Sequence, residues 1–272
     1  MREWKGSVAF ITGGGQGIGL GIARALAKRG VRLALADIDE AALRAARDEL
    51  AQVTDVEIFR LDVRDRESFA SVADTAEAKL GTVDLLFNNA GIAPYSSLSK
   101  MRYEMWDLAL GVNVMGVVNG VQTFVPRMIE RRRGGYVVNT ASGAGLVGGS
   151  NVLYTTSKFA VVGLSESLKM AAAKYGIDVS VLCPGPVATD ILSNTEKIGE
   201  GLSVVQKHGA HKDTEDFLRS GESIDAVGEM VIAGMEAKAT WIHTGAYIKE
   251  YVRMRMESLL ESIPGPIADQ VS

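Results

Sequence analysis

Short apolar runs alternate with longer amphipathic stretches along most of the chain, and this alternation limits the possible folds more than any other feature. The apolar runs predict strands over Ser7–Thr12, Arg32–Ala36, Val56–Arg60, Val83–Phe87, Tyr136–Asn139, Val179–Leu182 and Thr240–His243. The stretches between them predict helices over Ile18–Arg29, Glu40–Leu50, Glu67–Leu80, Met105–Ile129, Tyr154–Tyr175 and Asp225–Ala237. Such alternation is typical of parallel strands whose crossover helices cover both faces of a sheet. We therefore expect an α/β fold with one doubly wound parallel β-sheet.

No linker, repeat or low-complexity tract divides the 272 residues, so we expect one main domain over residues 1–246. Residues 191–222 interrupt the alternation with a polar, glycine-punctuated segment. Long irregular segments in compact domains are usually functional, so we predict a substrate lid there. Residues 247–272 form a predicted C-terminal tail, helical as far as Leu260 and then stopped by Pro264-Gly265-Pro266.

The composition excludes several classes of protein. A net charge of -4 argues against a general affinity for nucleic acid or for an anionic membrane, because both require clustered Lys and Arg. We find no apolar run close to the roughly 20 residues of a spanning helix and no secretory signal at the start of the chain. The single cysteine, Cys183, suits a reducing compartment, and the three histidines are too dispersed for a metal site. We expect a cytoplasmic protein without a metal.

A glycine-rich loop, Thr12-Gly13-Gly14-Gly15-Gln16-Gly17-Ile18-Gly19, joins the first predicted strand to the first helix. Glycines allow a tight turn and a close approach to a pyrophosphate, and the helix then directs its N-terminal N–H groups at the phosphates. The position between a strand and a helix makes this pattern specific. It predicts a dinucleotide-binding (Rossmann) fold with Gly13, Gln16, Gly17, Ile18 and Gly19 at the cofactor.

An acidic residue, Asp37, closes the second predicted strand. A carboxylate at this place can accept hydrogen bonds from the adenosine ribose and would repel a 2′-phosphate. Two like charges at about 4 Å and an effective dielectric of about 20 repel by about 4 kcal/mol. Gln16 supplies no positive charge to offset this repulsion. We therefore expect NAD rather than NADP, and we assign the helix-capping role to Asp39 instead.

Tyr154 and Lys158 are four residues apart at the start of a predicted helix, so both side chains can point into one volume. A free tyrosine has a pKa near about 10, and a neighbouring cation favours the phenolate. We expect the ammonium of Lys158 to lower the pKa of Tyr154, which could then exchange a proton with an alcohol or a ketone.

Together these motifs resemble the short-chain dehydrogenases/reductases, from Gly6 to about Thr244. The matching segments are the loop Thr12–Gly19, the Asn88-Asn89-Ala90-Gly91 run, Asn113, Ser142, the Tyr154/Lys158 pair and Pro184–Thr189. The resemblance implies a nicotinamide-dependent oxidoreductase with a Ser-Tyr-Lys-Asn mechanism.

The resemblance also implies a role for each matching residue. Tyr154 would be the acid/base and Ser142 would bind the substrate oxygen. Lys158 would bind the nicotinamide ribose, and Asn113 would hold a water of a proton relay. The remaining cofactor contacts implied by the family are Asp62 and Val63 at the adenine, Asn89 and Gly91 in the cleft, and Val187 and Thr189 at the carboxamide.

The substrate has to be inferred from the residues that follow the strands, where open parallel sheets bind ligands. These residues are mostly small or apolar, although Arg102, Lys207 or Arg219 could reach the cleft. We expect a neutral, fairly hydrophobic secondary alcohol or its ketone, with an aryl or cyclic group. The Asn139–Ser142 and Pro184–Pro186 stretches are similar to bacterial dehydrogenases that act on the benzylic alcohol of lignin-derived aryl ethers.

Two alternatives stay open. An NADPH-dependent carbonyl reductase would share most of these motifs, and Asp37 is the residue that distinguishes it. A non-catalytic dinucleotide sensor would be expected to lack part of the Ser142, Tyr154 and Lys158 set. The resemblance also implies a homodimer or homotetramer, built through the long helices that begin near Met105 and Tyr154.

Overall fold

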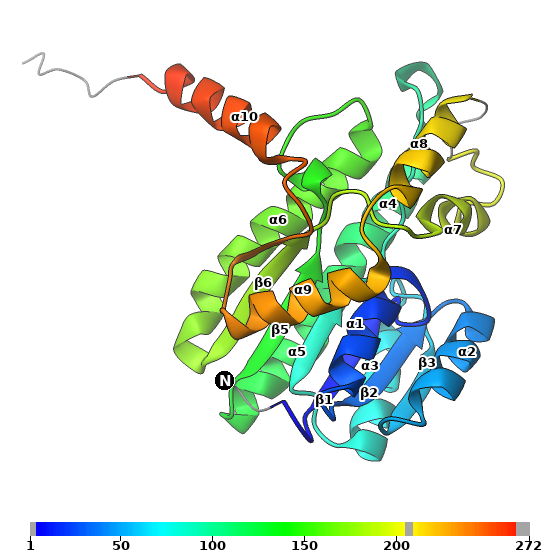
Figure 1. The fold of residues 1–272 in the computed structure, drawn as a ribbon, viewed down its shortest axis with the longest axis vertical. Coiled ribbons are helices and arrows are strands. Elements are labelled where there is room, and N and C mark those ends of the chain that lie inside the picture. Colours follow the sequence, from blue (N-terminus) through cyan, green and yellow to red (C-terminus); the bar gives the residue numbers. More distant parts are fainter. Residues whose placement is uncertain (1–3, 205–208, 265–272) are drawn as a thin grey trace, which may run out of the picture.

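A computed structural model describes residues 4–204 and 209–264, with the side chains of residues 209–211 outside the description. Within these ranges seven parallel strands form one sheet in the order β3-β2-β1-β4-β5-β6-β7 (Figure 1). The strands are β1 Val8–Thr12, β2 Arg32–Asp37, β3 Val56–Arg60, β4 Leu85–Asn88, β5 Gly135–Thr140, β6 Ile177–Cys183 and β7 Trp241–His243. The strand order reverses direction between β1 and β4, where the connection crosses to the other half of the sheet. The predicted doubly wound parallel sheet is confirmed.

The helices cover both faces of the sheet. They are α1 Gly17–Ala27, α2 Glu40–Leu50, α3 Arg66–Leu80, α4 Tyr103–Leu110, α5 Gly116–Arg131, α6 Val152–Ala172, α7 Ile191–Ile198, α8 Gly209–Arg219, α9 Ile224–Glu236 and α10 Lys249–Ser262. One apolar cluster joins the sheet to α1, α2 and α9 through Ile22, Leu43 and Val231. The other joins it to α3 and α5 through residues such as Phe69 and Phe124. Two buried layers therefore hold the sheet between them.

Aromatic packing shows how β1 anchors one of these layers. All five residues of β1 are buried, as expected for a central strand covered on both faces. The Phe10 ring lies 4.8 Å from Phe124 and 5.8 Å from Phe69, measured between centroids. These three rings hold α3 and α5 against the middle of the sheet. Cys183, which ends β6, is buried as a small apolar residue would be.

The prediction of one continuous helix over Met105–Ile129 was wrong. The structure has α4, then a π-helical turn at Gly111–Met115, then α5. A long-range contact explains the break: the buried Asn113 side chain bonds the backbone of Ile92 instead of facing solvent. Gly116 permits close packing here, because a Cβ on it would lie 2.7 Å from Cγ2 of Val63. Such π-turns often mark functional sites.

This interrupted helix also bears on the membrane prediction. The stretch Tyr103–Arg131 is long and apolar enough to cross a membrane by length and composition, although the sequence analysis found no such run. Yet 56% of its most apolar window is buried inside the protein, as in the core helix of a globular domain. Helices α4 and α5 are therefore helices of the protein core that pack against one face of the sheet.

The segment 191–222 is more regular than predicted, because it contains α7 and α8, while residues 205–208 lie outside the described part. Thr195, at the helical spacing of four from Ile191, is fully buried and holds α7 in place. Its hydroxyl accepts a hydrogen bond from Ala93 N at 2.8 Å. The predicted lid segment is therefore attached to the loop that follows β4.

The C-terminal tail is helical as predicted, with α10 starting two residues after Tyr247 and ending two after Leu260. Figure 1 shows α10 projecting away from the body of the protein, beyond the end of α6. None of its described residues is buried.

Candidate active site

The glycine loop between β1 and α1 has the geometry that its sequence predicts. Gly13 and Gly17 have φ values of +63° and +55°, which side chains rarely adopt. A Cβ on Gly13 would lie 2.9 Å from Cα of Ala90, and one on Gly19 would collide with the carbonyl oxygen of Gly13. The loop therefore needs glycine at these positions. Its backbone can approach a ligand closely at the N-terminus of α1.

Asp37, the last residue of β2, faces this loop. One carboxylate oxygen accepts a hydrogen bond from Gly15 N at 3.1 Å, and the other accepts from Asp39 N at 3.1 Å. Burial raises the pKa of Asp37, while these hydrogen bonds act in the opposite direction. The predicted cap is also confirmed, since Asp39 accepts from the N–H groups of Ala41 and Ala42. Asp37 thus fixes the loop while its side chain borders the cleft.

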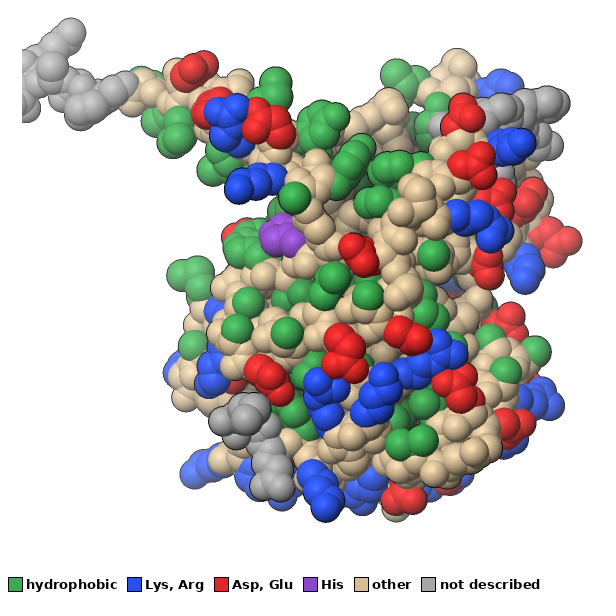
Figure 2. Space-filling view, viewed as in Figure 1, with side chains coloured by type: hydrophobic (Ala, Val, Ile, Leu, Met, Phe, Trp, Pro, Cys, Tyr) green, Lys and Arg blue, Asp and Glu red, His purple; other side chains and the backbone are tan. Residues whose placement is uncertain are grey.

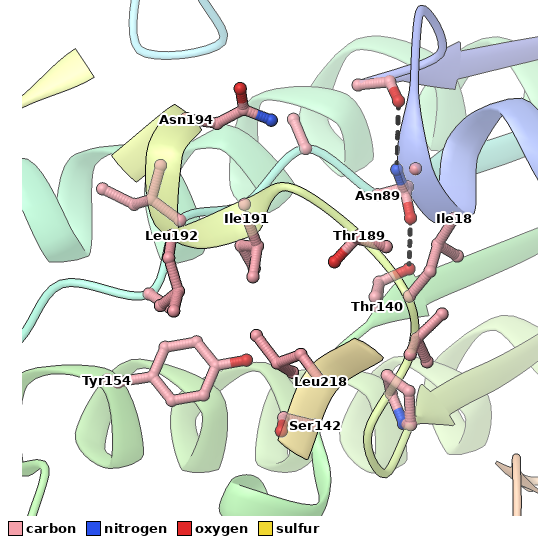
Figure 3. A pocket seen from close by; sticks show the side chains of 18 of the residues that line it. Ile18, Asn89, Thr140, Ser142, Tyr154, Thr189, Ile191, Leu192, Asn194 and Leu218 are labelled. Atoms are coloured by element: carbon pink, nitrogen blue, oxygen red, sulfur yellow. Dashed lines mark hydrogen bonds between the residues drawn. The ribbon is translucent and has the colours of Figure 1, made fainter. Parts of the chain in front are cut away.

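Asn89 connects three strand ends beneath the cleft. Its amide nitrogen donates to the carbonyl oxygens of Thr12 and Gly13 at 3.2 and 3.3 Å. Its amide oxygen accepts from the Thr140 hydroxyl at 3.2 Å (Figure 3). These bonds hold the carboxyl ends of β1, β4 and β5 together, so Asn89 shapes the cleft from below.

Tyr154, Lys158 and Ser142 converge at the other end of the cleft. Tyr154 lies in the first turn of α6, where the Asn151 side chain accepts its N–H at 3.3 Å. Figure 3 shows the Tyr154 hydroxyl pointing into the cavity, with the Ser142 side chain on the loop after β5 nearby. The Lys158 ammonium donates to the carbonyl oxygen of Thr140 at 3.0 Å and lies 5.6 Å from the centroid of the Tyr154 ring. The predicted pair therefore shares one volume.

The electrostatics of this pair differ from the expectation that Lys158 lowers the pKa of Tyr154. Burial raises the pKa of Tyr154 above its usual value, and only the hydrogen bond with Ser142 acts to lower it. Burial also lowers the pKa of Lys158 to about 8. Both groups lose hydration on burial, and this loss sets the direction of both pKa shifts.

Asn113 lies behind the cleft instead of lining it. Its amide nitrogen donates to Ile92 O and to the Ser157 hydroxyl, each at 2.9 Å, and its amide oxygen accepts from Ile92 N at 2.9 Å. A Cβ on Gly91 would lie 3.3 Å from both Oδ1 of Asn113 and Nζ of Lys158. Gly91 therefore allows Asn113 and Lys158 to approach each other. The side chain of Asn113 satisfies the backbone of Ile92, a residue outside its own helix.

The cleft is a cavity of about 1040 Å³ that brings most of the predicted residues together. Gly19 and Asn113 do not line it. The predicted residues that do are Gly13, Gln16, Gly17, Ile18, Asp37, Asp62, Val63, Asn89, Gly91, Ser142, Tyr154, Lys158, Val187 and Thr189. Thr189 lies directly over the glycine loop, because a Cβ on Gly17 would meet its methyl group at 3.4 Å.

Asp62 has a partner that no sequence motif predicts. Its carboxylate accepts hydrogen bonds from the Arg64 guanidinium at 2.6 and 2.9 Å, and Arg64 itself borders the cavity. This interaction lowers the pKa of Asp62. The charge of Arg64 is thereby neutralised at the adenine end of the predicted cofactor site.

Several cavity residues carried no motif. Tyr247 and Ile248 follow β7, and Lys197 lies on α7. Asn194 on α7 donates to the side-chain oxygen of Gln16 at 3.1 Å, so α7 touches the glycine loop. The position of Tyr247 and Ile248 beyond the carboxyl end of a strand was the signal that could have identified them.

The geometry and the sequence comparisons agree on the class of protein. A model of the short chain dehydrogenase family matches residues 7–198. The chain belongs to the short-chain dehydrogenase/reductase family of oxidoreductases.

Individual relatives support this assignment along nearly the whole chain. The C alpha-dehydrogenase of Sphingobium sp. strain SYK-6 is 31% identical over 269 residues, which are 97% of this chain and 88% of that protein. The 3beta-hydroxysteroid dehydrogenase 2 of Eggerthella lenta is 34% identical over 221 residues, or 80% of this chain and 82% of that protein. A crystal structure of a short-chain dehydrogenase/reductase from Burkholderia phymatum in complex with NAD is 34% identical, with a TM-score of 0.89, and covers 99% of this chain and 100% of that one.

Proposed function

We propose that this enzyme transfers a hydride between NAD and a neutral, fairly hydrophobic secondary alcohol or its ketone. One observation carries the proposal: the hydroxyls of Tyr154 and Ser142 and the ammonium of Lys158 share a cavity with the glycine loop and Asp37. A dinucleotide cradle and a proton-exchanging group thus border one volume. Such an arrangement serves oxidoreduction at a carbon that bears oxygen.

The cradle fits NAD by its shape and its charge. The loop keeps its close-packed shape only while Gly13 and Gly19 lack side chains. In this shape its backbone could approach a pyrophosphate at the N-terminus of α1. Asp37 is held by two backbone N–H groups with its carboxylate at the cleft, where it would bind ribose hydroxyls and repel a 2′-phosphate. The nearby Arg64 is already paired with Asp62. NAD, when bound, supplies the acceptor or donor of the hydride.

The protein's own residues would move the proton. We assign the proton exchange with the substrate oxygen to the Tyr154 hydroxyl and the stabilising hydrogen bond to Ser142. Lys158 would bind ribose hydroxyls and favour the phenolate, since it lies 5.6 Å from the Tyr154 ring centroid. Burial raises the pKa of Tyr154, so positive charge near the phenol would favour its deprotonation. Lys158 would supply such a charge, and NAD, when bound in its oxidised form, would add another. Asn113 lies behind Lys158, and its side chain is bonded to Ile92 and Ser157. The water of the proton relay would therefore be held by the backbone of the π-turn.

The walls near Tyr154 favour an apolar substrate. Ile191, Leu192 and Leu218 lie around the Tyr154 hydroxyl in Figure 3. The Phe217 and Tyr247 rings lie 5.3 Å apart at the cavity, which leaves no room for a third ring between them. They therefore form a single aromatic wall, against which an aryl or cyclic group of the substrate could pack.

Of the three cationic residues that could bind a charged substrate, two have other partners in the structure and one lies outside the described residues. The Arg219 guanidinium pairs with Glu215 at 2.8 Å, and Arg102 donates to the carbonyl oxygen of Leu202 at 3.5 Å. Lys207 lies outside the described residues. Lys197 is the remaining cation that borders the cavity on the lid, among the residues described. The names of two relatives, a C alpha-dehydrogenase and a hydroxysteroid dehydrogenase, agree with a secondary alcohol.

The remaining expectations stay predictions of this proposal: a cytoplasmic homodimer or homotetramer that binds neither nucleic acid nor membrane. The experiment that tests the function is a spectrophotometric assay of purified protein with NAD and with NADP. It uses a panel of neutral aryl, cyclic and short aliphatic secondary alcohols beside carboxylated ones. We expect turnover of neutral ring-bearing alcohols with a higher kcat/KM for NAD. Turnover of only charged or carrier-bound substrates, or a preference for NADP, would overturn the proposal.

A further inference from the structure

The C-terminal helix α10 exposes an unusual amount of apolar surface. The exposed fractions of Met256, Leu259, Leu260 and Ile263 are 46%, 43%, 65% and 64%. Figures 1 and 2 show the helix standing away from the body, with apolar side chains along its length. Among the described residues, the ring contact between α10 and α6 is the Arg255 guanidinium over Phe159, at 5.2 Å near the base of the helix. The body of the protein therefore leaves most of α10 uncovered.

A free helix of this length is marginal in water. Isolated helices shorter than about 12–15 residues are barely stable, and most helices in proteins depend on packing of an apolar face. α10 has 14 residues and buries none of them. A projecting helix with an exposed apolar face thus indicates a partner that covers it.

The apolar residues have the spacing of a helix-pairing seam. Val252, Met256 and Leu259 of α10 and Ile263, the residue directly after the helix, follow one another at intervals of four, three and four residues. This spacing places the first three on one stripe that ends at Ile263. Met254 lies off this stripe. Glu250 and Glu257, seven residues apart on another face, both pair with Arg253. The spacing indicates that the partner is a helix. The three basic and three acidic residues of α10 cancel, so the helix has no net positive charge that would attract an anionic membrane.

We propose that α10 pairs antiparallel with α10 of a second copy of this chain. The intervals four, three and four read the same in both directions, so two antiparallel copies match each other. Val252 then faces Ile263 of the second copy, and Met256 faces Leu259 of the second copy. Lys249 extends the stripe by one turn, and a parallel pair would place two Lys249 ammonium groups opposite each other. The antiparallel arrangement separates these charges.

This pairing would also act on the catalytic cavity. Tyr247 and Ile248, immediately before α10, border the cavity, and a Cβ on Gly143 would lie 3.4 Å from Cγ1 of Ile248. Gly143 follows Ser142 in the chain. Association of two arms would therefore fix one wall of each cavity close to the Ser142 hydroxyl.

The first test compares two glutamate variants of full-length protein by light scattering after gel filtration and by sedimentation at several concentrations. Met256→Glu places a charge on the seam, whereas Met254→Glu places the same charge on the same helix away from the seam. We expect wild type and Met254→Glu to share one mass and Met256→Glu to have half that mass. Circular dichroism and NAD binding verify folding. A monomeric wild type, or equal masses for all three proteins, would overturn the proposal.

The second test fixes the orientation by cross-linking. Under mild oxidation, Met256→Cys combined with Leu259→Cys should form a dimer linked by disulfides, because these positions face each other in the antiparallel pair. Met254→Cys should not form it, and the native Cys183 is buried. If Met256→Cys alone cross-links as fast as the double variant, the helices are parallel and the proposed orientation is wrong. Neither readout depends on catalysis, so a failure here is distinct from a failure of the proposed function.

Discussion

The ammonium nitrogen of Lys158 lies 5.6 Å from the centroid of the Tyr154 ring, one helical turn along α6. It also donates to the carbonyl oxygen of Thr140, at the end of the neighbouring strand β5. The amine is thus fixed by the sheet and faces the ring from its own helix. In this buried setting the pKa of Lys158 falls to about 8. Burial of the Lys158 ammonium therefore lowers the free energy of unfolding.

This cost has a defined pH dependence. Lys158 has an ordinary pKa of 10.5, which applies to the unfolded chain, and about 8 in the folded protein. Below pH 8 both states hold the proton and the full penalty is present. Between about 8 and 10.5 the unfolded state binds more protons, so stability rises with pH. Above that window the penalty is absent.

Lys158→Met should therefore raise the free energy of unfolding at pH 7. The penalty is about 3 kcal/mol, since each pH unit is worth about 1.36 kcal/mol, and losing the bond to Thr140 offsets about 1 kcal/mol. Chemical denaturation at pH 7 and at pH 10.5 measures the difference from wild type, which should shrink at the higher pH. Lys174→Met, at an exposed lysine near the end of the same helix, is the control. A Lys158→Met protein less stable than wild type at pH 7 would contradict this account.

The cofactor preference should change with the charge of Asp37. Asp37→Asn keeps a hydrogen-bond acceptor for Gly15 N or Asp39 N but removes the carboxylate. The ratio of kcat/KM for NADP to that for NAD should rise at least tenfold and up to about a thousandfold, the equivalent of about 4 kcal/mol. Asp48→Asn, an exposed acid near the far end of α2, should leave the ratio unchanged. An unchanged ratio in Asp37→Asn would show that another group selects the cofactor.

The glycine loop should tolerate no side chain at Gly19. Gly19→Ala places a Cβ against the carbonyl oxygen of Gly13, so the loop must move and NAD binding should weaken at least tenfold. Gly148→Ala adds the same methyl group where nothing lies within 4 Å, and it should bind NAD normally. Fluorescence titration with NAD measures both affinities, and circular dichroism monitors folding. Normal affinity in Gly19→Ala would be incompatible with the proposed cradle.

The aromatic wall should select among substrates. Tyr247→Leu removes one ring of the Phe217–Tyr247 contact and should lower kcat/KM for aryl-bearing alcohols by about 2- to 12-fold, because such contacts are worth about 0.5–1.5 kcal/mol. Short aliphatic alcohols should lose much less. Tyr175→Leu makes the same change just beyond the C-terminal end of α6, away from the cavity, and serves as the matched control. Equal losses for both alcohol classes would mean that Tyr247 supports the fold and does not recognise a ring.

The strands and most helices followed from local patterns in the sequence. The predicted bounds of α2 and β3 coincide with the structure, because an acidic cap precedes one and both carry clear periodicity. The break at Gly111–Met115 was missed because it depends on Ile92, a residue outside the helix. Helices α7 and α8 were not predicted, because each has a short apolar stripe among mostly polar residues.

The candidate site likewise contains residues that could be predicted from the sequence and residues that could not. Gly13, Asp37 and Tyr154 were predictable because their chemistry requires a fixed place beside a strand or a helix start. Tyr247 and Ile248 were not predicted, because they carry no motif and reach the cavity only through the pairing of β7 with β6. The direction of the Tyr154 pKa was also missed, since complete burial is a property of the packed protein.

The central claim is that the Tyr154 hydroxyl exchanges the proton with the substrate. The most direct measurement is kcat of Tyr154→Phe together with its dissociation constant for NAD. Phenylalanine preserves the ring beside Lys158 and removes only the hydroxyl. We predict a kcat at least a hundredfold lower, with NAD affinity within about twofold of wild type. Turnover near the wild-type rate would contradict the account.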